Sequence, residues 1–227
     1  MILYGSSMSP FVRKCLVVAA EKGVEVTLVP AGMGRGGPEF AEASPFGKMP
    51  ALRHVGANGG SDYCLADSSA IAAYIDALHP DPSLIPAAPM ARGKTIWWDE
   101  FVDTILFAAA SKVFFNRFVS PMVLKQPGNE DVVAHALAFE LPPLFDYLES
   151  QIPDSGFLVE DRFTLADIAV ASPFVNLGHV DVLIDAVHNP KTAAYVAGIL
   201  ARPSFAPIVA AERAMIAKMT EAVPALA

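Results

Sequence analysis

The sequence has little charge and few cysteines or histidines. Charged residues make up 18% of the 227 residues, and the two cysteines, Cys15 and Cys64, form no CxxC pair. Two isolated thiols are too few for a disulfide framework, which favours a reducing compartment such as the cytoplasm. The five histidines are scattered and show neither HxxxH nor mixed Cys/His spacing, so we expect no metal site.

Basic segments and long apolar runs are missing as well. Sixteen Lys and Arg against 24 Asp and Glu give a formal charge of −8, so we expect neither nucleic acid nor an anionic membrane surface as a partner. Each apolar stretch is broken by a charged residue or a proline before it could span a bilayer, and the first residues lack the pattern of a secretory signal. Because apolar residues amount to 53%, the sequence predicts a folded, core-rich cytoplasmic protein.

The first 79 residues alternate short strands with helices, in the order βαβ followed by ββα. Period-two and period-3.6 patterns predict strands at 2–5, 24–29, 51–55 and 63–65, and helices at 10–22, 38–43 and 67–78. This alternation is typical of a small α/β domain, which we assign to residues 1–79.

A proline-rich connector at residues 80–90 follows, with prolines at 80, 82, 86 and 89. Beyond it the pattern is helical only, which predicts an all-helical bundle over residues 91–227. Helices are expected at 91–118, 130–151, 165–178, 190–200 and 204–220. Pro142 and Pro143 fall inside the second of these and predict a kink or split near Leu141.

The segment GSSMSPF places a serine hydroxyl at a helix start, since Ser9 precedes Pro10 at the first helical position. Backbone N–H groups at a helix N-terminus favour an anion and can lower the pKa of a thiol held there from about 8.5 to roughly 3.5–7.5. Ser9 could donate a hydrogen bond to such a thiolate. The alternative is that Ser9 only caps the helix.

Two further motifs offer polar groups to a ligand. In FGKMPAL, Pro50 at a strand start suggests a cis Met49–Pro50 bond that would present the Met49 main chain to a peptide; a trans proline in an edge strand is the alternative. In LADSSAIAAYI, Asp67 and Ser68 at another helix start could bind the charged ends of an amino acid, or Asp67 could be a plain N-cap.

The segments LYGSSMSPFVRK, PEFAEASPFGKMPAL and LADSSAIAAYID resemble, in order and spacing, the glutathione-binding half of the cytosolic glutathione transferases. RFTLADIAVA and ILARPSFAP resemble the buried capping box and closing helix of that family, so the likeness covers nearly the whole chain. It implies a thioredoxin-like domain followed by a helical domain lining an apolar substrate site. The SPF motif points to the serine-type, bacterial-like members.

The resemblance also implies roles for single residues. Ser9 matches the serine that activates the glutathione thiol, and Tyr4, where tyrosine-type members keep their phenol, is the second candidate. Met49 and Pro50 match the residue whose main chain pairs with glutathione and the cis proline that follows it. Asp67 and Ser68 match the pair that holds the γ-glutamyl end, and Lys48 could reach the glycine carboxylate.

These roles predict an enzyme whose bound glutathione thiolate attacks a small apolar electrophile or a peroxide. The alternatives are a non-catalytic glutathione- or ligand-binding protein of the same fold and a glutathione-dependent isomerase, although SPF departs from the SSC signature of the maleylacetoacetate class. A glutathione-dependent disulfide reductase would need a cysteine in place of Ser9.

Other conspicuous residues are expected to be structural. Thr164 and Asp167 form a capping box at a helix start, and Cys15 lies on an apolar helix face. Core positions are the default for Phe101, Ile105, Phe114, Phe115 and Phe118, with some lining the second substrate's cleft. The apolar band at 96–107 is wider than one helix stripe, and relatives pair this region with a second subunit, so a homodimer is expected.

Overall fold

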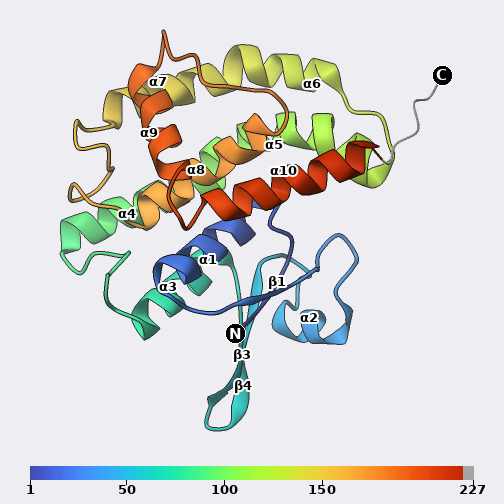
Figure 1. Cartoon of the computed structure of the whole chain (residues 1–227), viewed down its shortest axis with the longest axis vertical. Helices are drawn as coiled ribbons and strands as arrows, with labels where there is room; N and C mark the ends of the chain where they lie inside the picture. The colour runs from blue at the N-terminus through green and yellow to red at the C-terminus, as the bar shows by residue number, and fades with distance from the viewer. Residues whose placement is uncertain (222–227) are drawn as a thin grey trace. The chain divides into compact units, whose positions relative to one another are not determined.

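The structure, a computed structural model, describes residues 1–221 and divides into two compact units, residues 1–96 and the residues from 97 onward (Figure 1). The division falls inside a helix, between Ile96 and Trp97. The proline-rich segment at 80–90, where the sequence places the domain boundary, therefore belongs to the first unit, and that boundary stays a prediction.

The first unit is built on a four-stranded mixed sheet with strand order β2-β1-β3-β4. β1 pairs in parallel with β2 and antiparallel with β3, which in turn pairs antiparallel with β4. The predicted order of elements is confirmed: β1 (Ile2–Tyr4), α1 (Pro10–Glu21), β2 (Thr27–Val29), α2 (Gly37–Ala43), β3 (Ala51–Asn58), β4 (Ser61–Ala66) and α3 (Ser68–Leu78). This is the thioredoxin-like arrangement that the sequence predicts.

Different helices cover the two faces of this sheet. Side chains of consecutive strand residues point to opposite faces, so Leu3 and Tyr4 of β1 face different helices. Tyr4 packs in a buried cluster with Phe40 and Ala43 of α2. Helices α1 and α3 pack on each other and lie across the sheet from α2 (Figure 1).

A buried ion pair holds the start of the proline-rich connector. The fully buried Lys22 side chain, at the end of α1, pairs with Asp76 of α3 and also donates to the Pro82 carbonyl. Asp76 accepts from the backbone N–H groups of Leu84, at 2.7 Å, and Ile85, at 3.1 Å. The connector is thus fastened to the first unit by one lysine and one carboxylate.

The second unit is helical, and three of its helical stretches are π-helical. Its elements are α4 (Pro89–Phe101, which begins in the first unit), η1 (Val102–Leu106), α5 (Phe107–Phe114), η2 (Phe115–Leu124), α6 (Glu130–His135), η3 (Ala136–Glu140), α7 (Leu141–Gln151), α8 (Leu165–Gly178), α9 (Pro190–Leu200) and α10 (Ala206–Glu221). The predicted break near Leu141 is confirmed, because α7 begins there after η3. Pro142 and Pro143 lie in its first turn, where the missing N–H groups have no intrahelical role.

Helix α8 is the centre of this unit. Its residues from Leu165 to Leu177 are all buried, as expected for a helix that is apolar on every side. At its N-terminus the predicted capping box is present: Asp167 accepts from the backbone N–H of Thr164 at 2.9 Å and of Leu158 at 3.0 Å, and from the Tyr195 hydroxyl at 3.0 Å. Burial raises the pKa of Asp167. Burial also raises the pKa of Tyr195 well above its ordinary value, and the neighbouring Asp167 carboxyl raises the pKa of Tyr195 further. Asp167 is therefore structural, as predicted.

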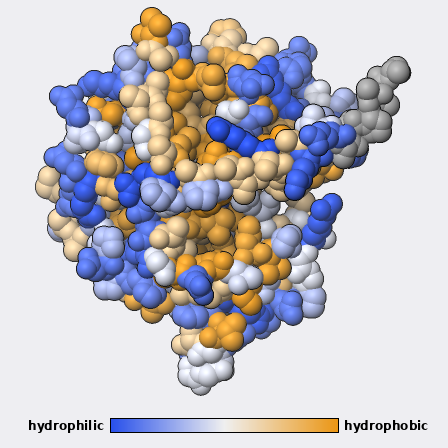
Figure 2. All heavy atoms as spheres, in the orientation of Figure 1, coloured by the Kyte–Doolittle hydropathy of each residue, from blue (hydrophilic) through white to orange (hydrophobic). Residues whose placement is uncertain are grey.

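The large apolar residues predicted for the core divide into two groups. Phe101, Phe114 and Phe118 are buried, whereas the Ile105 and Phe115 side chains are 48% and 45% exposed. On the face shown in Figure 2, apolar and hydrophilic residues are interspersed. Among residues 1–221, no helix is long and apolar enough to cross a bilayer.

Candidate functional site

The sheet register brings the three sequence motifs to one end of the sheet in the first unit. Tyr4, the last residue of β1, pairs with Ala51, the first of β3, and Ala51 pairs with Ala66, the last of β4. Neighbouring strands lie about 4.7–4.9 Å apart, so the residues just outside these positions also come close together. The Ser9 loop, the Met49–Pro50 bond and the Asp67 turn all lie at this end.

Close packing between loops supports this placement. A Cβ added to Gly5, whose φ is +154°, would lie 3.5 Å from the Cβ of Met49. A Cβ added to Gly32 would lie 2.7 Å from the Sδ of the same methionine. Met49 is thus held between the turns that follow β1 and β2. The Met49–Pro50 peptide is cis, as the FGKMPAL motif suggests.

Ser9 is the N-cap residue of α1, but its hydroxyl makes no capping hydrogen bond. Its backbone is extended, with φ −80° and ψ 125°, and its carbonyl accepts the first helical bond, from the Arg13 N–H at 2.9 Å. The side chain is half-buried. The alternative in which the hydroxyl only caps the helix therefore does not describe Ser9.

Tyr4, the second candidate, has a different environment. Its side chain is 3% exposed, and its ring lies 6.0 Å from the ring of Phe40 on the α2 face of the sheet. Its hydroxyl interacts with Arg53, whose pKa is raised chiefly by hydrogen bonds to Glu42 and Asp62. The phenol is thus packed among core residues next to a guanidinium.

Asp67 combines a cap with a backbone conformation that is rare for its residue type. Its Oδ1 accepts from the N–H groups of Ser69 at 2.9 Å and Ala70 at 3.1 Å, so the N-cap alternative is present in the structure. Its φ of +82° is unfavourable for a residue with a Cβ, and strain of this kind clusters at ligand sites. A carboxylate has a second oxygen, and Asp67 is exposed, so the cap leaves Oδ2 for a ligand cation.

The remaining predicted residues lie beside these groups. Ser68 is 3% exposed, and its carbonyl accepts from the Cys15 thiol of α1 at 3.6 Å. Lys48 is exposed, and its carbonyl accepts from the Ser44 hydroxyl at 2.6 Å. Both therefore belong to segments whose backbone is fixed by side-chain hydrogen bonds.

Ser69 lies beside Asp67 but is not among the predicted site residues. Its N–H binds Asp67, and its hydroxyl accepts from Lys14 Nζ at 3.2 Å, which joins the start of α3 to α1. Its signal in the sequence is the serine pair in LADSS. Within the described residues, no group of three or more His, Cys, Asp or Glu side chains could hold a metal ion.

Comparison with known proteins gives a consistent result. The family model for the glutathione S-transferase N-terminal domain matches residues 3–83, and that for the C-terminal domain matches residues 110–203. A glutathione S-transferase of Hyoscyamus muticus is 31% identical over 212 residues, which cover 90% of this chain and 95% of the relative.

Solved structures agree with this relationship. Glutathione S-transferase I bound with lactoylglutathione is 25% identical, with a TM-score of 0.79, over 92% of this chain and 98% of that one. Glutathione S-transferase I from Mais in complex with an atrazine glutathione conjugate is 26% identical, with a TM-score of 0.78, over 92% and 96%. With domains, fold and sequence in agreement, the protein belongs to the glutathione S-transferase family and is a transferase that uses glutathione as co-substrate.

Proposed function

We propose that the protein is a serine-type glutathione transferase in which Ser9 activates the thiol of bound glutathione. The observation that carries this proposal is the strand register, since it brings the Ser9 loop, the Met49–Pro50 bond and the Asp67 turn to one end of the sheet. The Ser9 hydroxyl at the start of α1 supports the role, because it makes no capping hydrogen bond that would fix its orientation, and its O–H can donate to a ligand sulfur.

In the proposed mechanism, the thiol of glutathione lies at the N-terminus of α1. The helix dipole and the Ser9 O–H, donating to sulfur, stabilise the thiolate and lower its pKa. The thiolate then attacks an electrophilic carbon of a small apolar substrate, and the carbon–sulfur bond forms as the leaving group departs with its electron pair and takes up a proton. With a peroxide the thiolate attacks one oxygen and breaks the O–O bond, which releases an alcohol after protonation; a second glutathione then converts the sulfenic acid to glutathione disulfide and water. The protein supplies orientation and electrostatic stabilisation rather than a covalent intermediate of its own.

The rest of the tripeptide is held away from the sulfur. The Met49 main chain pairs with the cysteinyl part, and Asp67 Oδ2 and Ser68 bind the γ-glutamyl end. Lys48 reaches the glycine carboxylate, for which its exposed ammonium is suited. A glutathione conjugate of atrazine, bound to the enzyme from Mais, is consistent with an aromatic or heteroaromatic electrophile as second substrate.

The test is the absorbance of the bound glutathione thiolate as a function of pH. In Ser9→Ala the fold should be retained and the thiolate should titrate at higher pH, with slower conjugation of chlorodinitrobenzene at neutral pH. An unchanged titration would refute the role of Ser9, and a larger shift in Tyr4→Phe would transfer the role to the phenol. Assays with an alkyl hydroperoxide and a mixed disulfide define the reaction, and glutathione binding without any turnover would indicate a ligand-binding protein.

We further propose that the protein is a cytoplasmic homodimer. The support is a set of large exposed apolar side chains: Phe46 is 89% exposed, and Ile96, Trp97 and Ile105 are between 39% and 48% exposed. Apolar surface of this kind is typical of interfaces. Sedimentation equilibrium is the test, since a single species near the chain mass of 24.1 kDa at micromolar concentration would refute the dimer.

A further inference from the structure

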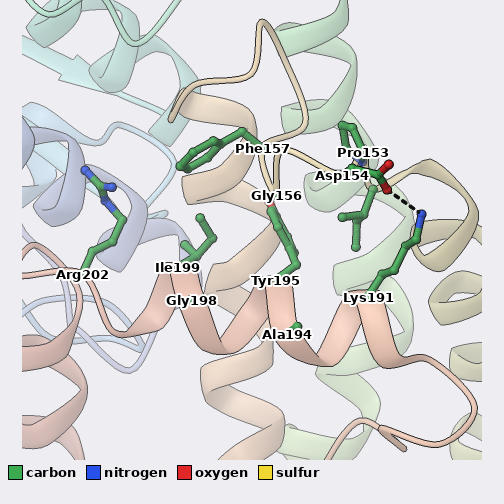
Figure 3. A pocket seen from close by; sticks show the side chains of 11 residues that line it. Pro153, Asp154, Gly156, Phe157, Lys191, Ala194, Tyr195, Gly198, Ile199 and Arg202 are labelled. Carbon is green, nitrogen blue, oxygen red and sulfur yellow. Dashed lines mark hydrogen bonds and ion pairs between the residues drawn. The ribbon is translucent and has the colours of Figure 1, made fainter.

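A pocket of about 450 Å³ lies in the second unit, between α9 and the segment 152–157 that follows α7 (Figure 3). This volume is within the range of sites that bind small organic molecules. All of its lining residues fall between Ile152 and Arg202, whereas every residue proposed to bind glutathione lies before residue 69. The pocket is therefore built from a separate part of the chain.

One face of α9 forms the floor of the pocket. Lys191, Ala194 and Gly198 follow one another at helical spacings of three and four residues, so these positions share a face of α9, and Arg202 continues the row just beyond the end of the helix. A Cβ added to Gly198 would meet no atom within 4 Å, which shows that the space above this position is open. A residue without a side chain at the centre of the row thus leaves room for a flat ligand.

The walls of the pocket are mainly apolar. Tyr195 and Ile199 of α9 contribute from one side, and Ile152 and Phe157 from the other. The Tyr195 hydroxyl donates to Asp167 at 3.0 Å, so the polar end of this side chain is already engaged in the capping box of α8. Tyr195 therefore offers its ring rather than its hydroxyl to the pocket.

Two cations stand at opposite ends of this apolar floor (Figure 3). The Arg202 guanidinium lies 3.8 Å from the centre of the Phe163 ring, which orients it at one end. At the other end Lys191 Nζ lies 3.4 Å from Oδ1 of Asp154, and these two side chains are 52% and 99% exposed. An ion pair this exposed is weak, so a ligand carboxylate can replace Asp154 on Lys191.

We propose that this pocket binds a small organic anion with a flat apolar body and one carboxylate. The apolar body lies over Ala194 and Gly198, and the carboxylate takes the place of Asp154 on Lys191 Nζ. Among the lining residues, Lys191 and Arg202 carry two positive charges against the single carboxylate of Asp154, so the pocket is locally cationic in a protein whose formal charge is −8.

Binding of 2-naphthoate, followed by isothermal titration calorimetry, tests the proposal, with uncharged 2-naphthamide as the matched compound. Gly198→Leu should fill the open space and weaken binding of 2-naphthoate by about tenfold or more, while the melting temperature is retained because Leu favours the helix over Gly. Gly93→Leu is the matched control, since Gly93 is also an exposed helical glycine with no atom within 4 Å of an added Cβ; its binding should be unchanged.

The charge variants test the position of the carboxylate. Lys191→Gln should weaken binding by about three- to tenfold, and Asp154→Asn should strengthen it by about two- to threefold because a competitor for Lys191 is removed. Each of the following would overturn the proposal: no binding of 2-naphthoate in the millimolar range, equal binding by Gly198→Leu, equal affinity for 2-naphthamide, or weaker binding by Asp154→Asn.

Discussion

Replacing Asp167 by alanine should be among the most damaging single changes in the second unit. It would leave four buried donors without their acceptor: the backbone N–H groups of Leu158 and Thr164 and the hydroxyls of Thr164 and Tyr195. A buried donor left unpaired costs about 1–3 kcal/mol, and removal of a buried carboxylate returns part of this sum by relieving its desolvation. We expect a net loss of about 3–5 kcal/mol in the free energy of unfolding.

The assay is urea unfolding followed by circular dichroism, with Asn129→Ala as the matched control. Asn129 caps α6 through hydrogen bonds of 3.1 and 3.2 Å to the N–H groups of Asp131 and Val132, but its site is exposed. Water can replace an exposed cap, so this variant should lose only about 1 kcal/mol. A loss in Asp167→Ala no larger than that in Asn129→Ala would refute the argument that burial makes this cap important.

Three further predictions follow from the geometry. Burial raises the pKa of Asp167 above its ordinary value of 3.8, so the stability gained by protonating this carboxyl in the folded state is full below pH 3.8 and is lost as the pH rises through the folded-state pKa. In paired urea titrations the deficit of Asp167→Asn should therefore shrink between acid and neutral pH, and a growing deficit would contradict this sign. Asp67→Ala should raise the KM for glutathione by about tenfold with little change in kcat, because the Asp67 carboxylate holds the γ-glutamyl end, which is remote from the reacting sulfur. Steady-state kinetics showing a change in kcat alone would contradict the assignment. Lys22→Met should lower the melting temperature, because it leaves the buried Asp76 carboxylate without its cation. Arg162→Met breaks an exposed ion pair with Glu160 and should have little effect, so equal effects of the two substitutions in thermal scans would contradict the role of the buried pair.

Local signals in the sequence were sufficient for much of the fold. The Ser9–Pro10 helix start, the capping box of Thr164 and Asp167 and the proline pair at 142–143 each act on the backbone within a few residues, so their outcomes could be predicted. The extent of the helices was less predictable. The helix expected to end at about residue 118 continues to Leu124 as a π-helix that includes Pro121, which the local pattern does not predict.

The chemistry of single residues depended on contacts that are distant in sequence. The motif GSSMSPF is compatible with a capping or a free Ser9 hydroxyl, and only the folded loop shows that it does not cap. Likewise, the register of three strands, set by the burial of alternate side chains, decides that positions 4, 51 and 66 align. The pocket above Gly198 has no sequence signature, since it exists only because the segment 152–157 lies opposite α9. Local propensity thus determined the type and order of the elements and several of their starts, and tertiary packing decided which side chains they bring together.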